Sequence, residues 1–500
     1  MKSRKLTVII VSLCMCVSVL SGCGSTAEKE QVQHAAETQT AEAEPDTSLE
    51  DGEYTVNVEL EGGSGRASVD SEAKVKVTDG QAYATIVWSS TYYDYMLVDG
   101  KKYINENEGG NSTFTFPIAG VPCTMDVVGD TTAMSQPHEI DYTLTFSFAK
   151  DVSFKDLKQT GQVKLSYADQ FQIDEYGNYK LITIVDNGRF LLIPKGVPVP
   201  ADVPEDVIVL QQPLNHVYLV SSAVMDLICQ AGGLSHVAYT ALKEDDWYVQ
   251  QAKDAMADGS LVYAGKYSAP DYELILNEGC DLAIESTMIH HNPEVQEKLE
   301  QFGIPVMVER SSYESHPLGR TEWMKLYAVL LGKEDVAEKV FKEQTDKLDN
   351  VLTADKTDKT VAFFYINSVG AVNVRKSGDY VSEMISLAGG NYVPEDTGES
   401  DNALSTMNMQ MEEFYAKAKD ADYIIYNSTI DGELQTIDEL LSKSELLADF
   451  KAVKNGNVWC TGKNLFQETT GLGTMIEDIH TMLTTDDDSL DNLTYMHKLK

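Results

Sequence analysis

Arginines and aromatic residues in the C-terminal part of the sequence could together bind an anionic, partly apolar molecule. The guanidinium groups of Arg310 and Arg375 are planar and always charged, so each can donate two parallel hydrogen bonds to a carboxylate or a catecholate. Aromatic side chains could form flat apolar walls beside them. A surface salt bridge is the alternative interpretation for any one arginine. The candidate ligand-binding residues follow predicted strands, and they are Tyr239, Trp247, Tyr267, Arg310, Tyr313, Tyr365, Arg375 and Tyr380.

The sequence lacks the motifs of the common catalytic sites. It contains no GxSxG, no HExxH and no phosphate-binding glycine loop. We therefore expect a binding protein rather than an enzyme, with no resident cofactor. A hydrolase acting on cell-wall material remains an alternative, because it would need only two converging carboxylates, which a sequence cannot demonstrate. The formal net charge of −40 repels polyphosphate and argues against nucleic acid as a partner.

Cysteines and histidines form no recognisable metal site in the sequence. His316 precedes a predicted helix and is expected to cap it rather than to bind a metal, and His290 and His291 are expected to be solvated on a loop. The cysteines beyond residue 23 are scattered without a CxxC pair, which excludes a zinc ribbon or an iron–sulfur spacing. Buried free thiols are the simplest interpretation, although disulfides are open to an exported protein. These cysteines are Cys123, Cys229, Cys280 and Cys460.

Residues 1–22 have the pattern of a secretory signal, with cations before an apolar run that ends in small residues. The order Leu-Ser-Gly-Cys that ends at Cys23 resembles the lipobox of bacterial lipoproteins. The resemblance implies cleavage before Cys23, acylation of its thiol and a lipid anchor at the outer face of the cell membrane. An ordinary secreted protein with a chance cysteine is the alternative. Residues 23–50 are rich in Ala, Glu, Thr and Gln, which predicts a flexible tether.

Residues 51–150 read as an all-β sandwich. Short alternating runs are separated by turn signals such as Asp79-Gly80 and Asp99-Gly100, which are typical of hairpins. The aromatic cluster from Trp88 to Tyr95, with Met134 to His138, weakly resembles the ligand-binding edge of the haem-binding sandwiches called NEAT domains. Their tyrosine pair is matched only by Tyr142 and Phe146. An alternative function is therefore a surface scavenger of haem or metal whose sandwich is the binding unit, and the other interpretation is ordinary packing.

Residues 180–490 alternate between strand-like and helix-like segments, which predicts an α/β fold with parallel strands. The expected architecture is two Rossmann-like lobes, residues 180–316 and 353–490, joined by one long helix over residues 317–352. The helix is predicted because apolar residues recur at helical spacing from Leu318 to Val351. The overall expectation is therefore an α/β protein with two lobes and a linker helix, preceded by an all-β sandwich.

Several motifs in this region carry a family resemblance. Pro270-Asp-Tyr-Glu273 leads into a strand at Asp281, His316-Pro-Leu-Gly-Arg320 opens the linker, and Ala388-Gly-Gly-Asn recurs in the second lobe. In this order, the elements resemble the substrate-binding proteins of ABC importers for iron–siderophore complexes, haem and cobalamin. The resemblance implies that two facing lobes capture a small-molecule chelate and deliver it to permease subunits.

The same resemblance assigns a role to two acids. Proteins of this group present one glutamate on each lobe to arginines of the permease, and the matching positions are Glu273 and Glu412, with Glu413 as a rival for the second. Charge-complementary docking of this kind fixes orientation and raises the association rate. Chance surface acids are the alternative. The ligand stays open among haem, a ferric siderophore and a corrinoid.

Overall fold

The computed structural model describes part of the chain. The described residues are 49–133, 138–150, 152–354, 356–395, 397, 406–485 and 489–500. The predicted signal, Cys23, nearly all of the tether and the segment from Met134 to Pro137 lie outside them. Within the described residues, no helix combines the length and the apolar character needed to cross a membrane.

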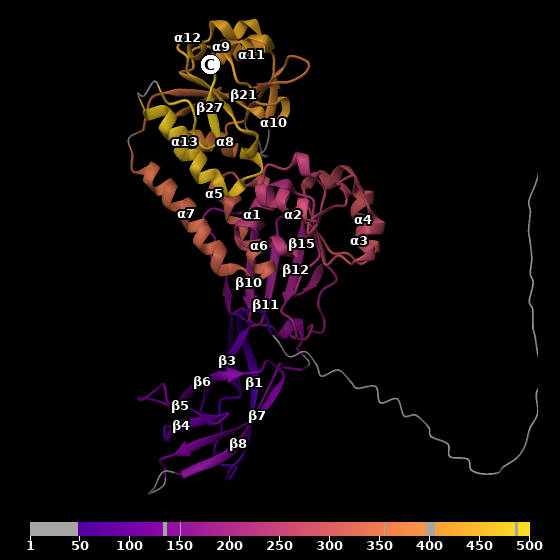
Figure 1. The fold of residues 1–500 in the computed structure, drawn as a ribbon, viewed down its shortest axis with the longest axis vertical. Coiled ribbons are helices and arrows are strands. Elements are labelled where there is room, and N and C mark those ends of the chain that lie inside the picture. The colour runs from indigo at the N-terminus through magenta and orange to yellow at the C-terminus, as the bar shows by residue number, and fades with distance from the viewer. Residues whose placement is uncertain are drawn as a thin grey trace, which may run out of the picture. The chain divides into compact units, whose positions relative to one another are not determined.

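The first eight strands, indigo to purple in Figure 1, form the predicted all-β region. They pair antiparallel in one continuous sheet, in the order β5-β4-β7-β8-β1-β2-β3-β6, rather than in two separate sheets. The Asp79-Gly80 and Asp99-Gly100 turns join hairpins as predicted, because all four residues adopt the positive φ that a tight two-residue turn requires. The strands are β1 (Gly52–Gly62), β2 (Glu72–Thr78), β3 (Gln81–Val87), β4 (Tyr93–Val98), β5 (Lys101–Ile104), β6 (Thr113–Ile118), β7 (Cys123–Thr131) and β8 (His138–Ser147).

A second, five-stranded sheet follows, where the sequence had predicted the start of the first lobe. Its strands pair antiparallel except for β12 and β13. Leu191 and Ile193 pack into the core of the first sheet, whereas Phe190 and Leu192 pack into the core of the following lobe. Because both faces of this sheet are buried, its strands have continuous apolar sequences like those of strands in a parallel sheet. The strands are β9 (Gly161–Gln162), β10 (Phe171–Tyr176), β11 (Tyr179–Ile184), β12 (Gly188–Ile193) and β13 (Val207–Gln211).

Lobe 1, residues 217–316, is a parallel α/β lobe as predicted, but it begins later than residue 180. Its five strands are all parallel, in the order β16-β15-β14-β19-β20. Helices α1 and α2 connect the first three strands along the chain. The elements are β14 (Val217–Leu219), α1 (Ser222–Gln230), β15 (Val237–Thr240), α2 (Gln250–Asp258), β16 (Val262–Tyr263), β17 (Gly265–Lys266), β18 (Ala269–Pro270), α3 (Tyr272–Asn277), β19 (Leu282–Glu285), α4 (Pro293–Gln301) and β20 (Val306–Val308).

Lobe 2, residues 356–500, has a mixed seven-stranded sheet in which β21, β23, β25 and β26 run parallel. It extends beyond the predicted end at residue 490, because β27 pairs with β26. The strands are β21 (Thr360–Ile366), β22 (Val372–Arg375), β23 (Asn391–Val393), β24 (Thr406–Met409), β25 (Tyr423–Tyr426), β26 (Val458–Thr461) and β27 (Met496–Lys498). The helices are α8 (Tyr380–Leu387), α9 (Met411–Ala418), α10 (Ser428–Asp431), α11 (Ile437–Lys443), α12 (Lys451–Lys454) and α13 (Leu472–Thr484).

The prediction of one continuous linker helix over residues 317–352 is wrong. The linker consists of α5 (Pro317–Glu322), α6 (Met324–Leu331) and α7 (Glu334–Leu352). Gly332 ends α6 in the left-handed conformation, at φ 66° and ψ 43°. Helix α6 is buried almost throughout and packs on α1 of lobe 1, whereas the amphipathic α7 packs on α13 of lobe 2. The break therefore separates a helix belonging to lobe 1 from a helix belonging to lobe 2.

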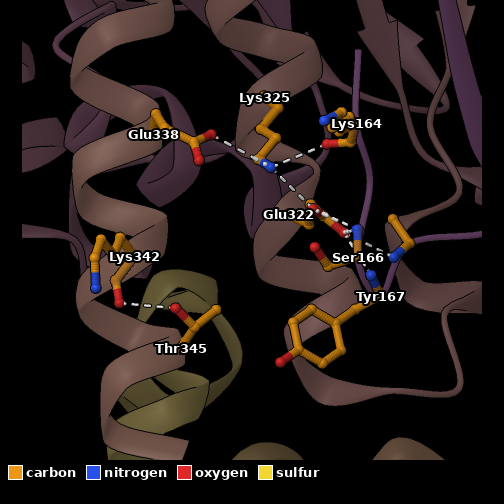
Figure 2. Close-up of polar contacts among 9 residues, drawn as sticks. Lys164, Ser166, Tyr167, Glu322, Lys325, Glu338, Lys342 and Thr345 are labelled. Atoms are coloured by element: carbon orange, nitrogen blue, oxygen red, sulfur yellow. Dashed lines mark hydrogen bonds and ion pairs between the residues drawn. The ribbon is translucent and has the colours of Figure 1, made fainter. Parts of the chain in front are cut away.

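Two buried glutamates at the start of the linker hold a short strap, residues 163–170, that precedes β10. The carboxylate of Glu322 accepts hydrogen bonds from the backbone N–H groups of residues 166–168 at 2.8–2.9 Å, and Glu314 accepts those of residues 169 and 170 at 3.0 and 3.1 Å. Figure 2 shows the Glu322 half of this arrangement, with the ammonium of Lys325 3.0 Å from the same carboxylate. Five successive amides thus donate to two buried carboxyl groups.

Candidate ligand-binding site

A cavity of about 430 Å³ opens at the carboxyl ends of the lobe 1 strands. In the order of the sheet, β14 lies between β15 and β19, so the chain turns to opposite sides of β14 at this point. Open parallel sheets bind ligands where such a reversal leaves a crevice between the loops. The cavity is lined by Val220, Ala241, Leu242, Lys243, Asp246, Tyr263, Lys266, Tyr267, Ser286 and Met288. The two lysines and two tyrosines could bind an anionic molecule with an apolar body.

Two buried acids lie at the ends of neighbouring strands in the same lobe. Glu285 ends β19 and is fully buried, and neither oxygen of its carboxyl group has a hydrogen-bond partner among the described residues. Burial raises the pKa of Glu285 to about 8, so the group is mainly protonated at neutral pH. Glu309 follows β20 and accepts hydrogen bonds from the Ser221 hydroxyl at 2.9 Å and from the Ser311 backbone at 2.7 Å. The sequence did not point to Glu309.

The structure separates the three aromatic residues predicted to bind ligand in the first part of lobe 1. Tyr267 is half-buried and lines the cavity. Trp247 is 1% exposed in the hydrophobic core that contains Val249 and Ala252, so its prediction as a cleft residue is corrected. Tyr239 is also buried, and its hydroxyl lacks a hydrogen-bond partner. Both side chains follow the ordinary preference of large aromatic groups for the core.

Arg310 lies at the second sheet rather than in the lobe 1 cavity. Its guanidinium carbon is 4.2 Å from the ring centre of Tyr313, and both residues had been predicted to bind ligand. The Nη1 atom is 3.3 Å from the carboxylate of Asp186, in the turn between β11 and β12. The Nε group donates to the side-chain oxygen of Gln170 at 3.1 Å. Arg310 therefore makes the salt bridge that was the alternative interpretation.

The candidate residues of lobe 2 form a compact group around Tyr380, apart from Tyr365. Arg375 ends β22, is 3.4 Å from the carboxylate of Asp379, and keeps only 15% of its side chain exposed. Tyr380 begins α8 and is buried, with the guanidinium carbon of Arg375 5.9 Å from its ring centre. Tyr365 on β21 is half-buried and packs against another core cluster of the lobe. The charge of Arg375 is thus already paired within lobe 2.

Arg320 also lies in this group, and the sequence analysis missed it as a candidate. It belongs to α5, is 8% exposed, and holds its guanidinium carbon 4.1 Å from the ring centre of Tyr380. No hydrogen bond or ion pair joins it to any described residue, and its buried Nε group has no partner. The sequence signal was its place in the His316-Pro-Leu-Gly-Arg320 motif, which indicated only the start of a helix.

The two lobes contact each other directly in the described structure. Asp226 on α1 accepts hydrogen bonds from the backbone N–H and the hydroxyl of Thr470 at 2.8 and 2.5 Å. The hydroxyl of Thr321 on α5 donates to the carbonyl of Thr469 at 2.9 Å. Gln467 spans the loops that follow β15 and β26, because its side chain accepts from the N–H of residue 248 and donates to the carbonyl of residue 246.

The acids predicted to face a permease are both on the surface. Glu273 lies in the first turn of α3, and Glu412 in the first turn of α9, and both are exposed. The rival Glu413 is paired with Lys417 at 3.0 Å. Glu412 makes no ion pair with any described residue, which leaves its carboxylate available for an external partner.

The aromatic cluster of the first sheet is mainly core rather than a binding edge. Trp88 stacks on Tyr93 with ring centres 3.8 Å apart, and the hydroxyls of Tyr93 and Tyr142 are 2.8 Å apart in a buried hydrogen bond. Tyr92 remains exposed at the surface, and Tyr95 donates its hydroxyl to Glu139. The packing interpretation of the cluster is therefore the one that the structure supports.

Metal ligation has no support among the described residues, where no three His, Cys, Asp or Glu side chains gather as ligands. The Nδ1 atom of His316 accepts a hydrogen bond from the N–H of Leu318 at 3.1 Å, which confirms the predicted helix cap. His290 and His291 are exposed, as expected. The four predicted free thiols are unpaired, namely Cys123, Cys229, Cys280 and Cys460.

Comparison with known proteins identifies a family match over nearly half of the chain. Residues 220–465 match the family model described as periplasmic binding protein. An uncharacterized lipoprotein of Methanocaldococcus jannaschii is 27% identical over 348 residues, which cover 66% of this chain and 79% of that protein. The periplasmic haem-binding protein HutB of Vibrio cholerae aligns with a TM-score of 0.45 and 19% identity, over 54% of this chain and 100% of that one. A periplasmic haem-binding protein of Pseudomonas aeruginosa aligns with a TM-score of 0.45 and 15% identity, over 57% and 98%.

Proposed function

Because residues 220–465 belong to the periplasmic binding protein family, we propose that this chain captures a small molecule outside the cytoplasm and delivers it to an ABC importer. The family is one of binding proteins rather than enzymes. The observation that carries the proposal is the cavity at the carboxyl ends of β14 and β19, in a lobe that contacts a second α/β lobe. Two such lobes can enclose a ligand between them.

The proposed ligand is an iron complex, either a ferric siderophore or haem, or else a corrinoid. Lys243 and Lys266 supply positive charge to the cavity, and Tyr263 and Tyr267 supply aromatic surface. This combination favours a bulky chelate with acidic substituents over a bare divalent metal.

The proposed location is the outer face of the cell membrane, with the acylated Cys23 as anchor and residues 23–50 as tether. The proposal rests on the Leu-Ser-Gly-Cys order and on a relative that is itself named a lipoprotein. Glu273 and Glu412 are the proposed contacts to permease arginines, since both are exposed in the first turns of α3 and α9.

The direct test uses the soluble chain without residues 1–23. Haemin, cyanocobalamin and a panel of ferric chelates are titrated separately while the visible spectrum and the tryptophan fluorescence are recorded. We expect saturable binding of one class of chelate and no binding of free iron. A double substitution of Lys243 and Lys266 to Gln should weaken the binding of that chelate. The same double substitution at the exposed Lys101 and Lys102 of the first sheet should leave it unchanged. Failure of every iron and corrinoid chelate to bind would refute the proposed ligand class.

A further inference from the structure

Arg320 is unusual among the arginines of the described structure. Arg189, Arg310 and Arg375 each lie within 3.4 Å of a carboxylate, and Arg66 is exposed. Arg320 is 8% exposed and has no carboxylate partner among the described residues. Burying a guanidinium without a counter-charge is costly, because the group loses its hydration and gains no compensating hydrogen bond. A buried guanidinium that has no counter-charge among the described residues is a candidate binding group for an external anion.

The aromatic contact that the structure gives Arg320 covers one face of its guanidinium. The ring of Tyr380 lies 4.1 Å away and contributes a cation–π contact from lobe 2. This contact satisfies no N–H donor, and the buried Nε group has no acceptor among the described residues. The donor edge of the guanidinium is therefore free to bind a planar oxyanion.

The position of Arg320 is the junction of the two lobes. The neighbouring Thr321 donates its hydroxyl to Thr469 of lobe 2, and Tyr380 begins α8 of the same lobe. Arg375 lies on the same aromatic ring, 5.9 Å from its centre, and its charge is balanced by Asp379. One positive charge without a carboxylate partner among the described residues thus lies where the lobes meet.

We propose that Arg320 binds a carboxylate group of the ligand, so that the ligand is an acidic chelate recognised at the lobe junction as well as in the lobe 1 cavity. This inference rests on the proposed function. A planar, singly charged carboxylate fits best, because it accepts two parallel hydrogen bonds and balances one charge. A doubly charged phosphate would leave one negative charge unbalanced by Arg320.

The first experiment tests the subsite without any chelate. Selectively ¹⁵N-arginine-labelled soluble chain is titrated with sodium oxalate, with sodium chloride at equal ionic strength as reference. The Arg320 Nε–H resonance is assigned from its absence in Arg320→Lys. We expect this resonance to shift saturably with oxalate. The shift should be unchanged in Arg310→Lys, because the Arg310 guanidinium of the wild type already has a carboxylate partner. An Arg320 resonance that does not respond to oxalate would overturn the proposal.

The second experiment relates the subsite to the transported ligand. Haemin and haemin dimethyl ester, which lacks free carboxylates, are compared by Soret titration on wild type, Arg320→Met and Arg310→Met. Wild type and Arg310→Met should prefer haemin by about tenfold or more, and Arg320→Met should lose that preference while still binding the ester. If Arg320→Met kept the wild-type preference for haemin over the ester, the role of Arg320 would be overturned.

The two experiments separate the failure of one proposal from that of the other. If neither haemin nor any other chelate binds but oxalate still shifts the Arg320 resonance, the carboxylate subsite is supported and the proposed ligand class falls. If a chelate binds and Arg320 responds neither to oxalate nor to esterification, the function stands and the subsite is refuted. Thermal unfolding of each variant, Arg320→Met and Arg310→Met included, verifies that the variants are folded.

Discussion

The carboxylate of Asp226 in lobe 1 accepts two hydrogen bonds from Thr470 in lobe 2, and both side chains are buried. Asp226 lies on α1, which follows the central strand of lobe 1, and Thr470 immediately precedes α13. The contact joins residues that are 244 positions apart in the sequence. It links the lobes by a charge-assisted hydrogen bond in which solvent does not compete.

Substitution of Thr470 by Val should destabilise the fold. The change removes the hydroxyl donor to the buried Asp226 carboxylate, at a cost of about 1–3 kcal/mol. The hydrogen bonds from the Thr470 backbone N–H and from the Gln230 side chain remain. Urea unfolding measures this loss in free energy. Thr345→Val is the matched control, since the exposed Thr345 hydroxyl donates only to a carbonyl of its own helix (Figure 2). Equal effects of the two substitutions would show that the contact between the lobes contributes nothing special.

Glu285 should make the stability depend on pH in a defined direction. Its pKa in the folded protein is about 8, against about 4.5 unfolded, so the folded state holds the proton more tightly. Stability is therefore highest below about pH 4.5 as far as this group is concerned, and it falls as the pH rises through about 8, by at most about 5 kcal/mol. Tyr218 and Tyr272, whose pKa values are raised, stay neutral over this range.

The Glu285→Gln variant tests that assignment. Urea unfolding of wild type and variant is compared at several pH values, and the variant should lose most of the fall in stability between about pH 4.5 and pH 8. Glu273→Gln, which removes an exposed carboxyl group from the same lobe, should leave the pH profile unchanged. A Glu285→Gln profile parallel to that of wild type would mean that Glu285 ionises normally.

Glu322 should be more important for stability than Glu338, the exposed second carboxylate that pairs with Lys325. Glu322→Gln weakens the acceptor for the amides of residues 166–168 and leaves Lys325 without its buried partner, which should cost about 3 kcal/mol. Hydrogen exchange at those three amides should accelerate at the same time. The control is Glu338→Gln, because Glu338 is exposed and lies 3.3 Å from the same ammonium (Figure 2). Unchanged exchange in Glu322→Gln would contradict the role of this carboxylate.

Local turn chemistry made parts of the fold predictable. The Asp79-Gly80 and Asp99-Gly100 turns were identified correctly because positive φ is a property of those residues themselves. The five-stranded second sheet was not, because strands such as β12 are buried on both faces and read like the strands of a parallel sheet. The break at Gly332 was missed because apolar residues recur at helical spacing on both sides of it.

The candidate site was harder to predict than the fold. Residue type marked Arg310 and Arg375 as potential ligand-binding residues. Their carboxylate partners, Asp186 and Asp379, are brought close only by the tertiary structure. The same limitation concealed Arg320, which is distinguished only by the absence of such a partner among the described residues. Tyr267 lines the cavity because it follows β17, a strand of a separate two-stranded sheet, and its place after a predicted strand did suggest this.

Gly332 should resist substitution because it separates the linker helix that packs on lobe 1 from the one that packs on lobe 2. Its φ of 66° is strained for any residue with a Cβ atom, although no atom would contact that Cβ. Gly332→Ala should therefore cost about 1 kcal/mol in urea unfolding, and Gly332→Asn less, because Asn tolerates this conformation. Gly378→Ala is the control, since Gly378 has equally open surroundings and no positive φ, and it should be neutral. If Gly332→Ala were also neutral, the helices would not depend on a left-handed residue between them.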